Sequence, residues 1–138
     1  MDTQKQIDIV RKLVEEFYIE NAPYTGLMFQ NLEEREHIIT IGTSILCTKW
    51  GVGYQGGGFV QAFVSNDLQE SIGRADGTSL KGFKFFGQLI YNTPMPTFEK
   101  EILRLREGTD SFDSVMANVL DNVLGFDESN EVGKRTNL

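Results

Sequence analysis

The stretch His37–Trp50, HIITIGTSILCTKW, carries the strongest β-strand signal in the chain. His37–Ile41 and Ser44–Trp50 are rich in isoleucine and threonine, which favour strands. Gly42-Thr43 stands between them, and a Gly-X pair suits the type II′ turn of a tight hairpin. The pattern predicts a β-hairpin over residues 37–50. A lone hairpin is only marginally stable, so it needs a third strand or a helix to cover it.

Helical patterns surround this predicted hairpin. Apolar residues recur at helical intervals in residues 3–20 and along one face of Phe59–Ala75. Two further helices are predicted near the C-terminus, over Thr97–Arg106 and Asp110–Gly125. The predicted fold class is therefore α+β: a small antiparallel sheet built on the 37–50 hairpin, packed by N-terminal, central and two C-terminal helices.

Residues 83–91 are ambiguous between helix and strand. Leu80, Phe83, Phe86 and Ile90 can be drawn on one helical face, but glycines at 82 and 87 disfavour a helix. The phenylalanine, isoleucine and tyrosine content favours a strand. We therefore expect residues 83–91 to form the third strand.

The length of 138 residues fits one domain. We expect a single globular domain over residues 1–126 and a flexible C-terminal tail over residues 127–138. The tail has no large apolar residues except Val132 and Leu138, so it offers little to a core.

The formal charge of −7 argues against general affinity for nucleic acid or for anionic membrane surfaces. Residues 107–131 contain seven acidic residues and no lysine or arginine. This stretch is either a solvated helix face with a flexible tail or a docking surface for a basic partner. No apolar run approaches the roughly 20 residues of a membrane-spanning helix. The single cysteine, Cys47, allows no intrachain disulfide and favours a reducing, cytoplasmic location.

Residues 51–58, GVGYQGGG, form a glycine-rich loop between the predicted hairpin and the next helix. The loop contains a GxGxxG pattern, in which backbone N–H groups can approach a phosphate at a helix N-terminus. The βαβ unit of a dinucleotide fold and the lysine of a phosphate-binding loop are missing, and consecutive glycines also suit a tight turn. The candidate residues for binding a small anionic or nucleotide-like ligand are Lys49, Trp50, Gly53, Tyr54, Gly56, Gly57 and Gly58.

The sequence offers no catalytic constellation. His37 is the only histidine, so any histidine-dependent mechanism must use it. On the predicted hairpin His37 pairs with Thr48, which directs Cys47 to the opposite face and argues against a Cys–His dyad. No spacing matches a metal motif, and no cofactor is predicted.

Two functions remain open. The first is a non-enzymatic interaction or assembly protein that binds a protein partner or itself, because residues 110–125 carry a continuous apolar stripe. The candidate interface residues are Phe112, Val115, Met116, Val119, Leu120 and Val123. The alternative is a binder or hydrolase of a small phosphate-bearing ligand that uses the Gly51–Gly58 loop.

Overall fold

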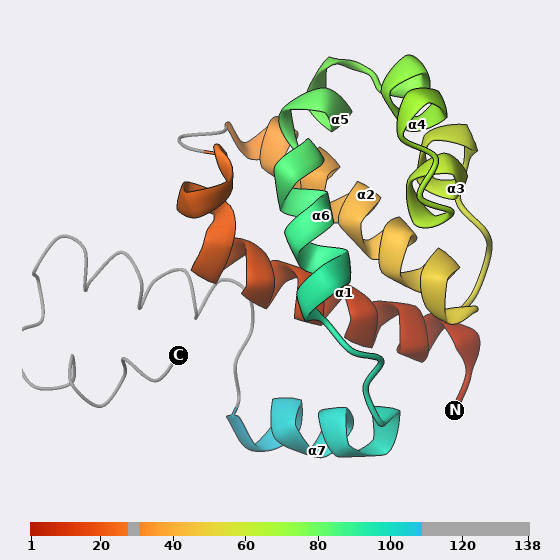
Figure 1. Ribbon diagram of the computed structural model, residues 1–138. Helices are drawn as coiled ribbons and strands as arrows, with labels where there is room; N and C mark the ends of the chain where they lie inside the picture. The colour runs from red at the N-terminus through yellow and green to blue at the C-terminus, as the bar shows by residue number, and fades with distance from the viewer. Residues whose placement is uncertain (28–30, 109–138) are drawn as a thin grey trace, which may run out of the picture.

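A computed structural model describes residues 1–27 and 31–108, and in this part of the chain the fold is all helical, with no sheet (Figure 1). The elements are α1 (Thr3–Asn21), η1 (Ala22–Thr25), α2 (Leu32–Trp50), α3 (Gly58–Val64), α4 (Leu68–Arg74), α5 (Gly77–Lys81), α6 (Phe83–Asn92) and α7 (Phe98–Gly108). The predicted α+β class is therefore wrong.

The predicted hairpin over residues 37–50 is part of the long helix α2. The helix starts at a side-chain cap, because the Asn31 carboxamide oxygen accepts a hydrogen bond from the Glu34 amide at 2.7 Å. It ends at Gly51, which has a left-handed φ of 70°. Four apolar side chains are completely buried along it, namely Ile38, Ile39, Ile45 and Leu46. Their burial outweighs the weak strand preference of the β-branched residues.

Gly42 lies inside α2 and marks a close helix crossing rather than a turn. A Cβ at this position would lie 3.0 Å from Val14 Cγ1 of α1 and 3.1 Å from Leu89 Cδ2 of α6. The missing side chain therefore lets α1 and α6 approach α2 at the same level. In the sequence, Gly42 stands between two apolar runs, and this pattern predicted a hairpin turn.

The third predicted strand is the helix α6. Its Phe85, Phe86 and Leu89 side chains are completely buried. Phe85 packs against the α1 rings of Phe17 and Tyr18 at centroid distances of 5.7 and 5.6 Å. The helix forms because this aromatic face is buried against α1 and α2, which offsets the cost of Gly87 in its interior.

The helix predicted over residues 59–75 is broken into α3 and α4. Asn66 adopts a left-handed conformation with a φ of 63°, which ends α3. Asp67 then caps α4, because its carboxylate accepts a hydrogen bond from the Glu70 amide at 3.1 Å. The two short helices pack against each other, and α3 packs against α2.

Helix α7 lies at the lower edge of the molecule and packs against α1 (Figure 1). Phe98 is its buried anchor, and Arg104 binds both carboxylate oxygens of Glu16 on α1, at 2.9 and 3.1 Å. None of the described helices is long and apolar enough to cross a membrane. The helix predicted over residues 110–125 and the tail predicted over residues 127–138 lie outside the described residues.

Candidate functional site: an apolar groove beside α6

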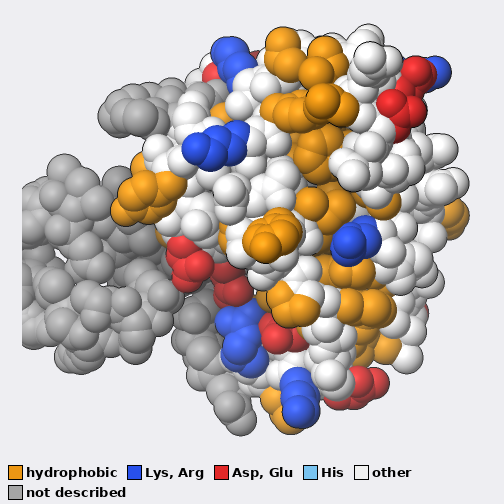
Figure 2. Space-filling view, viewed as in Figure 1, with side chains coloured by type: hydrophobic (Ala, Val, Ile, Leu, Met, Phe, Trp, Pro, Cys, Tyr) orange, Lys and Arg blue, Asp and Glu red, His pale blue; other side chains and the backbone are white. Residues whose placement is uncertain are grey.

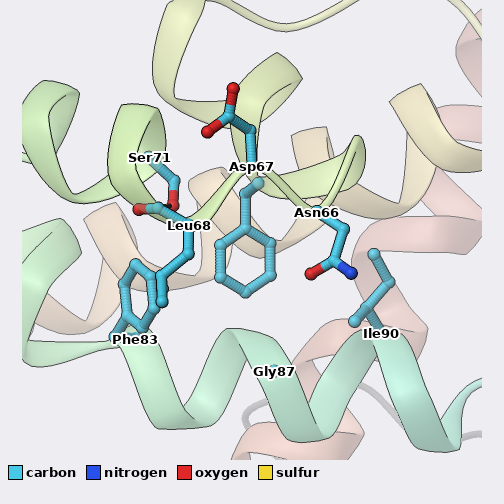
Figure 3. Close-up of a pocket in the computed structure, with 8 residues that line it drawn as sticks. Asn66, Asp67, Leu68, Ser71, Phe83, Gly87 and Ile90 are labelled. Atoms are coloured by element: carbon cyan, nitrogen blue, oxygen red, sulfur yellow. Dashed lines mark hydrogen bonds between the residues drawn. The ribbon is translucent and has the colours of Figure 1, made fainter.

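A groove of about 240 Å³ lies between α6 and the turn that joins α3 to α4 (Figure 3). We call it the α4–α6 groove. Its lining is largely apolar, with Asn66, Asp67 and Ser71 as the polar members. The full lining is Phe63, Asn66, Asp67, Leu68, Ser71, Phe83, Gly87 and Ile90.

The α6 wall is formed by Phe83, Gly87 and Ile90. These positions are four and three residues apart, so they share one face of the helix. Gly87 lies between the two larger side chains, and a Cβ built there would meet no atom within 4 Å. The groove therefore stays open at its middle because position 87 has no side chain.

The opposite wall comes from α3, α4 and their connecting turn. Phe63 packs edge-on against Phe83 across the base of the groove, with ring centroids 5.2 Å apart. Leu68 projects over it from α4 and is 59% exposed. In Figure 3 the Asp67 carboxylate points away from the groove, consistent with its role as the α4 cap. The interior thus offers apolar contact with few polar groups.

Hydrophobic side chains continue beyond the groove. Ile72, which is 48% exposed, lies one helical turn after Leu68 on the same face of α4. Figure 2 shows hydrophobic side chains as a band that runs down the molecule between α6 and the α3–α4 pair. A contiguous exposed apolar surface of this kind is typical of contact sites.

The α6 side of the groove carries positive charge. Lys84 is exposed on α6, beside Phe83, and makes no ion pair or hydrogen bond with the described residues. Lys81 is paired with Glu34 of α2 at 3.1 Å. Residues 77–98, which include α5 and α6, contain these two lysines and no acidic residue. The α6 side of the groove would therefore attract an acidic partner.

The sequence-predicted ligand residues around the glycine-rich loop do not line one site. Tyr54 is 87% exposed and borders a second cavity of about 310 Å³ between α1 and α2. Trp50 is partly buried and packs against the core, whereas Lys49 is exposed. Lys49, Trp50, Gly53, Gly56, Gly57 and Gly58 line neither of the two cavities.

Most of the loop glycines have structural explanations. Gly51 and Gly53 have φ values of 70° and 71°, a region that favours glycine. Gly56 crosses α2 closely, since a Cβ there would lie 2.5 Å from Ser44 Oγ. A Cβ at Gly58 would lie 2.8 Å from the Arg74 guanidinium. Gly57 precedes α3 in an extended conformation and is surrounded by open space.

The second cavity contains hydroxyl groups, but its one cation is already paired. Arg11 binds Glu15 at 3.2 Å and also contacts Glu36 and the Thr40 hydroxyl. Asp8 also lines the cavity. The remaining polar lining is Gln4, Thr40, Thr43 and Ser44. A free anion would therefore compete with the Glu15 and Glu36 carboxylates for Arg11.

His37 and Cys47 do not form a catalytic pair. They lie ten residues apart on α2, which corresponds to about 15 Å along the helix axis. His37 Nε2 lies 3.4 Å from the Asp76 carboxylate on the α5 side. Cys47 is buried, and this burial raises the pKa of its thiol to about 11, so the reactive thiolate is disfavoured. Within residues 1–27 and 31–108, no three potential metal ligands cluster.

Sequence reasoning missed the α4–α6 groove because it treated residues 59–75 as one helix. That reading placed Leu68 and Ile72 on the buried face, in line with Phe63. The available signal was the pair Asp67 and Glu70, which has the spacing of a capping box and marks a new helix start.

The six sequence-predicted interface residues, Phe112, Val115, Met116, Val119, Leu120 and Val123, lie outside the described part of the chain. Comparison with protein-family models, with curated proteins and with solved structures finds no match to this chain.

Proposed function

We propose that this chain is a non-enzymatic interaction protein that assembles with itself through the α4–α6 groove. The observation that carries the proposal is an apolar groove bordered by the exposed side chains of Leu68 and Ile72. Exposing apolar surface to water costs free energy, and covering it with a partner recovers that free energy. A cytoplasmic location belongs to the same proposal, since the one cysteine is kept as a buried thiol.

The size of the groove favours a protein partner over a small molecule. Pockets that enclose a drug-sized ligand have volumes of about 300–1,000 Å³. The α4–α6 groove, at about 240 Å³, is smaller. It suits one or two apolar side chains from a partner, with the surrounding apolar band providing the rest of the contact.

The distribution of charge favours a partner of the same sequence. Residues 107–131 hold seven acidic residues and no basic ones. The rest of the chain holds thirteen acidic and thirteen basic residues, so the net charge of −7 equals the charge of this one stretch. A chain has complementary features for a second copy when it carries an acidic stretch and, beside an apolar groove, a lysine such as Lys84 that has no ion pair among residues 1–27 and 31–108.

The oligomeric state of the full chain tests the proposal. Light scattering coupled to size exclusion, at protein concentrations from about 1 to about 100 µM, covers the range of a typical homotypic interface. We expect a dimer or a larger assembly that dissociates on dilution. A strict monomer across this range would contradict the proposal.

A small-anion binder remains the second candidate. It rests on Tyr54, which is exposed at the mouth of the cavity that holds the Thr40 and Ser44 side chains. A nucleotide panel in a thermal-shift assay tests it, together with the ratio of absorbance at 260 and 280 nm. The absence of any shift, with the absorbance ratio of bare protein, would remove this candidate.

A further inference from the structure

We infer that the α4–α6 groove receives the apolar stripe of residues 110–125 from a second copy of the chain. The stripe is the set Phe112, Val115, Met116, Val119, Leu120, Val123 and Leu124. This inference rests on the proposed self-association and names the two surfaces that make it.

The spacing of large apolar residues along the sequence is the same in the α6 wall and in the stripe. Phe83 and Ile90 bound the groove along α6 and are seven residues apart, which is about 10 Å on a helix. Phe112 and Val119 are also seven residues apart, and the sequence predicts that they lie on one helical face. Binding of a helix in an apolar groove uses anchors at this spacing. Gly87 leaves space between the groove's two large side chains for an anchor.

The charges of the two surfaces are opposite. Asp110, Asp113 and Asp121 are the charged residues of the 110–125 segment. Lys84 on the groove side is exposed and has no partner among the described residues. Asp67 and Glu70, the nearest acids on the α4 side, are engaged by the α4 cap and by Arg74 respectively. Lys84 would therefore attract the acids of the helix to the α6 side of the groove, on the wall opposite Asp67.

The connection between α7 and the segment favours a second copy over the chain's own groove. The described chain ends at Gly108, and the helix predicted from sequence begins at Asp110, so the two are at most about 7 Å apart. Helix α7 packs against α1, whereas the α4 wall packs against α3. In Figure 1 the end of α7 lies at the lower left and the α3–α4 pair at the upper right. The segment therefore starts far from its own groove, a restriction that does not apply to a neighbouring copy.

Filling the groove tests the acceptor surface. Gly87→Leu places a side chain in the open space between Phe83 and Ile90, so we expect it to raise the dissociation constant of the full-chain assembly by about tenfold or more. Gly73→Leu is the control, because a Cβ at position 73, as at position 87, would meet no atom within 4 Å, and position 73 does not line the groove. Leucine favours helix over glycine at both positions, and circular dichroism checks folding.

Truncating the stripe tests the donor surface. The double variant Phe112→Ala with Val119→Ala removes two anchors and keeps a good helix former at both positions. We expect a loss of affinity like that of Gly87→Leu. Asn118→Ala, which changes a polar position off the stripe, is expected to keep the wild-type dissociation constant within about twofold.

Mixing the two damaged full-length chains is the decisive experiment. The Gly87→Leu chain keeps an intact stripe, and the double variant keeps an intact groove. An intact groove can therefore meet an intact stripe only when the two chains bind each other. Native mass spectrometry should show each variant alone as a monomer and the mixture as a mixed dimer, at a concentration where the wild type assembles. A mixture that stays monomeric overturns the inference.

Other results would distinguish a failure of self-association from a failure of the two assigned surfaces. A wild type that is always monomeric contradicts self-association and the inference together, including the case where the segment binds its own chain. If each variant still assembles when it is measured by itself, self-association is supported, but the assignment of the contact to the groove and the stripe is wrong. Should Gly87→Leu fail to fold, Gly87→Ala is the replacement, with a smaller expected loss of affinity and Gly73→Ala as its control.

Discussion

Gly56 occupies a position where a side chain would collide with its surroundings. A Cβ there would lie 2.5 Å from Ser44 Oγ and 2.6 Å from Val60 Cγ1. The Gly56 amide donates a hydrogen bond to Thr48 Oγ1 at 2.9 Å, which ties the loop to α2. The glycine is therefore needed for the close approach of the loop to α2 and α3, whether or not the loop binds a ligand.

We expect Gly56→Ala to lower the free energy of unfolding by about 1–3 kcal/mol, the usual cost of overpacking. Urea unfolding followed by circular dichroism measures it. Gly73→Ala is the control, because a Cβ at position 73 meets open space and alanine favours the α4 helix. Equal stability of Gly56→Ala and the wild type would show that the loop can shift to accept a side chain.

Asp76 caps α5 and makes a pH-dependent contribution to stability. Hydrogen bonding from the Ser79 amide, at 2.7 Å, holds the pKa of Asp76 below its ordinary value of 3.8, and His37 lowers it further. A carboxylate with a lowered pKa in the folded state stabilises the fold at pH values above the ordinary pKa. That stabilisation is lost as the pH falls through the lowered pKa.

We expect Asp76→Asn to be less stable than the wild type near pH 6 by up to about 1 kcal/mol, because the site is exposed and screened by solvent. Asparagine keeps the capping hydrogen bond, so the variant removes only the charge. The difference in unfolding free energy should shrink as the pH falls below 3.8 and disappear once the pH is below the lowered pKa of Asp76. A difference that is constant from pH 6 to pH 3 would assign it to something other than the carboxylate charge.

At the scale of elements, α7 depends on few contacts. Phe98 is 8% exposed and is its buried anchor, and Arg104 holds it to α1 through Glu16. An exposed ion pair typically contributes about 1 kcal/mol or less, whereas burying a phenylalanine contributes about 1.5–3 kcal/mol, so Phe98 carries most of the attachment. The connector between α6 and α7 contains Pro94 and Pro96, which limit its conformations without adding contacts.

We expect Phe98→Ala to lower the free energy of opening of α7 by about 3 kcal/mol. Amide hydrogen exchange resolved along the chain should show faster exchange in residues 98–108 and unchanged protection in α2. Leu103→Ala, at an exposed position of the same helix, should leave both regions unchanged. Faster exchange throughout the molecule would mean that α7 and the core unfold as one unit.

The elements were only partly predictable from sequence, and α2 shows why. Isoleucine and threonine suggested strands around Gly42, but the strand preference of such residues is small and depends on packing. The caps of the real helix were visible, with Asn31 and Glu34 at its start and Gly51 at its end. What sequence could not supply was the three-way crossing at Gly42, because Val14 and Leu89 come from distant parts of the chain.

The candidate site was also not predictable from sequence, and the short helices α3 and α4 show why. Apolar periodicity correctly predicted helix on both sides of Asn66, but the left-handed residue turns α4 relative to α3. This turn exposes Leu68 and Ile72, which a continuous helix would have buried beside Phe63. The groove therefore exists because of one backbone conformation, and no apolar pattern encodes that conformation. The glycine-rich loop had the more conspicuous sequence, but most of its glycines have structural explanations.

At the scale of the whole molecule, the balance of charge predicts a response to salt. The stretch 107–131 has seven acids, and Lys84 beside the groove makes no ion pair within the described part of the chain. Salt weakens the attraction between such charges, because exposed charges more than about 10 Å apart are largely screened at 0.1 M salt. The apolar part of the contact is insensitive to such screening.

We expect the dissociation constant of the assembly to rise several-fold, by up to about tenfold, between about 0.05 M and about 0.5 M sodium chloride. Sedimentation velocity at the two salt concentrations measures the change. Lys84→Gln should weaken association at low salt and reduce its salt dependence, whereas Lys100→Gln, on α7, should behave as the wild type. Tighter association at high salt would mean that charge attraction does not contribute.

Trp50, the last residue of α2, gives the molecule an intrinsic fluorescent probe. It is the only tryptophan, it packs partly buried against the core, and it immediately precedes the loop that leads to α3. It lines neither cavity and belongs neither to α7 nor to the groove. Its emission maximum should shift to longer wavelength when the core unfolds and stay constant when α7 opens or copies separate. Unlabelled protein can therefore report core unfolding independently of the other two transitions.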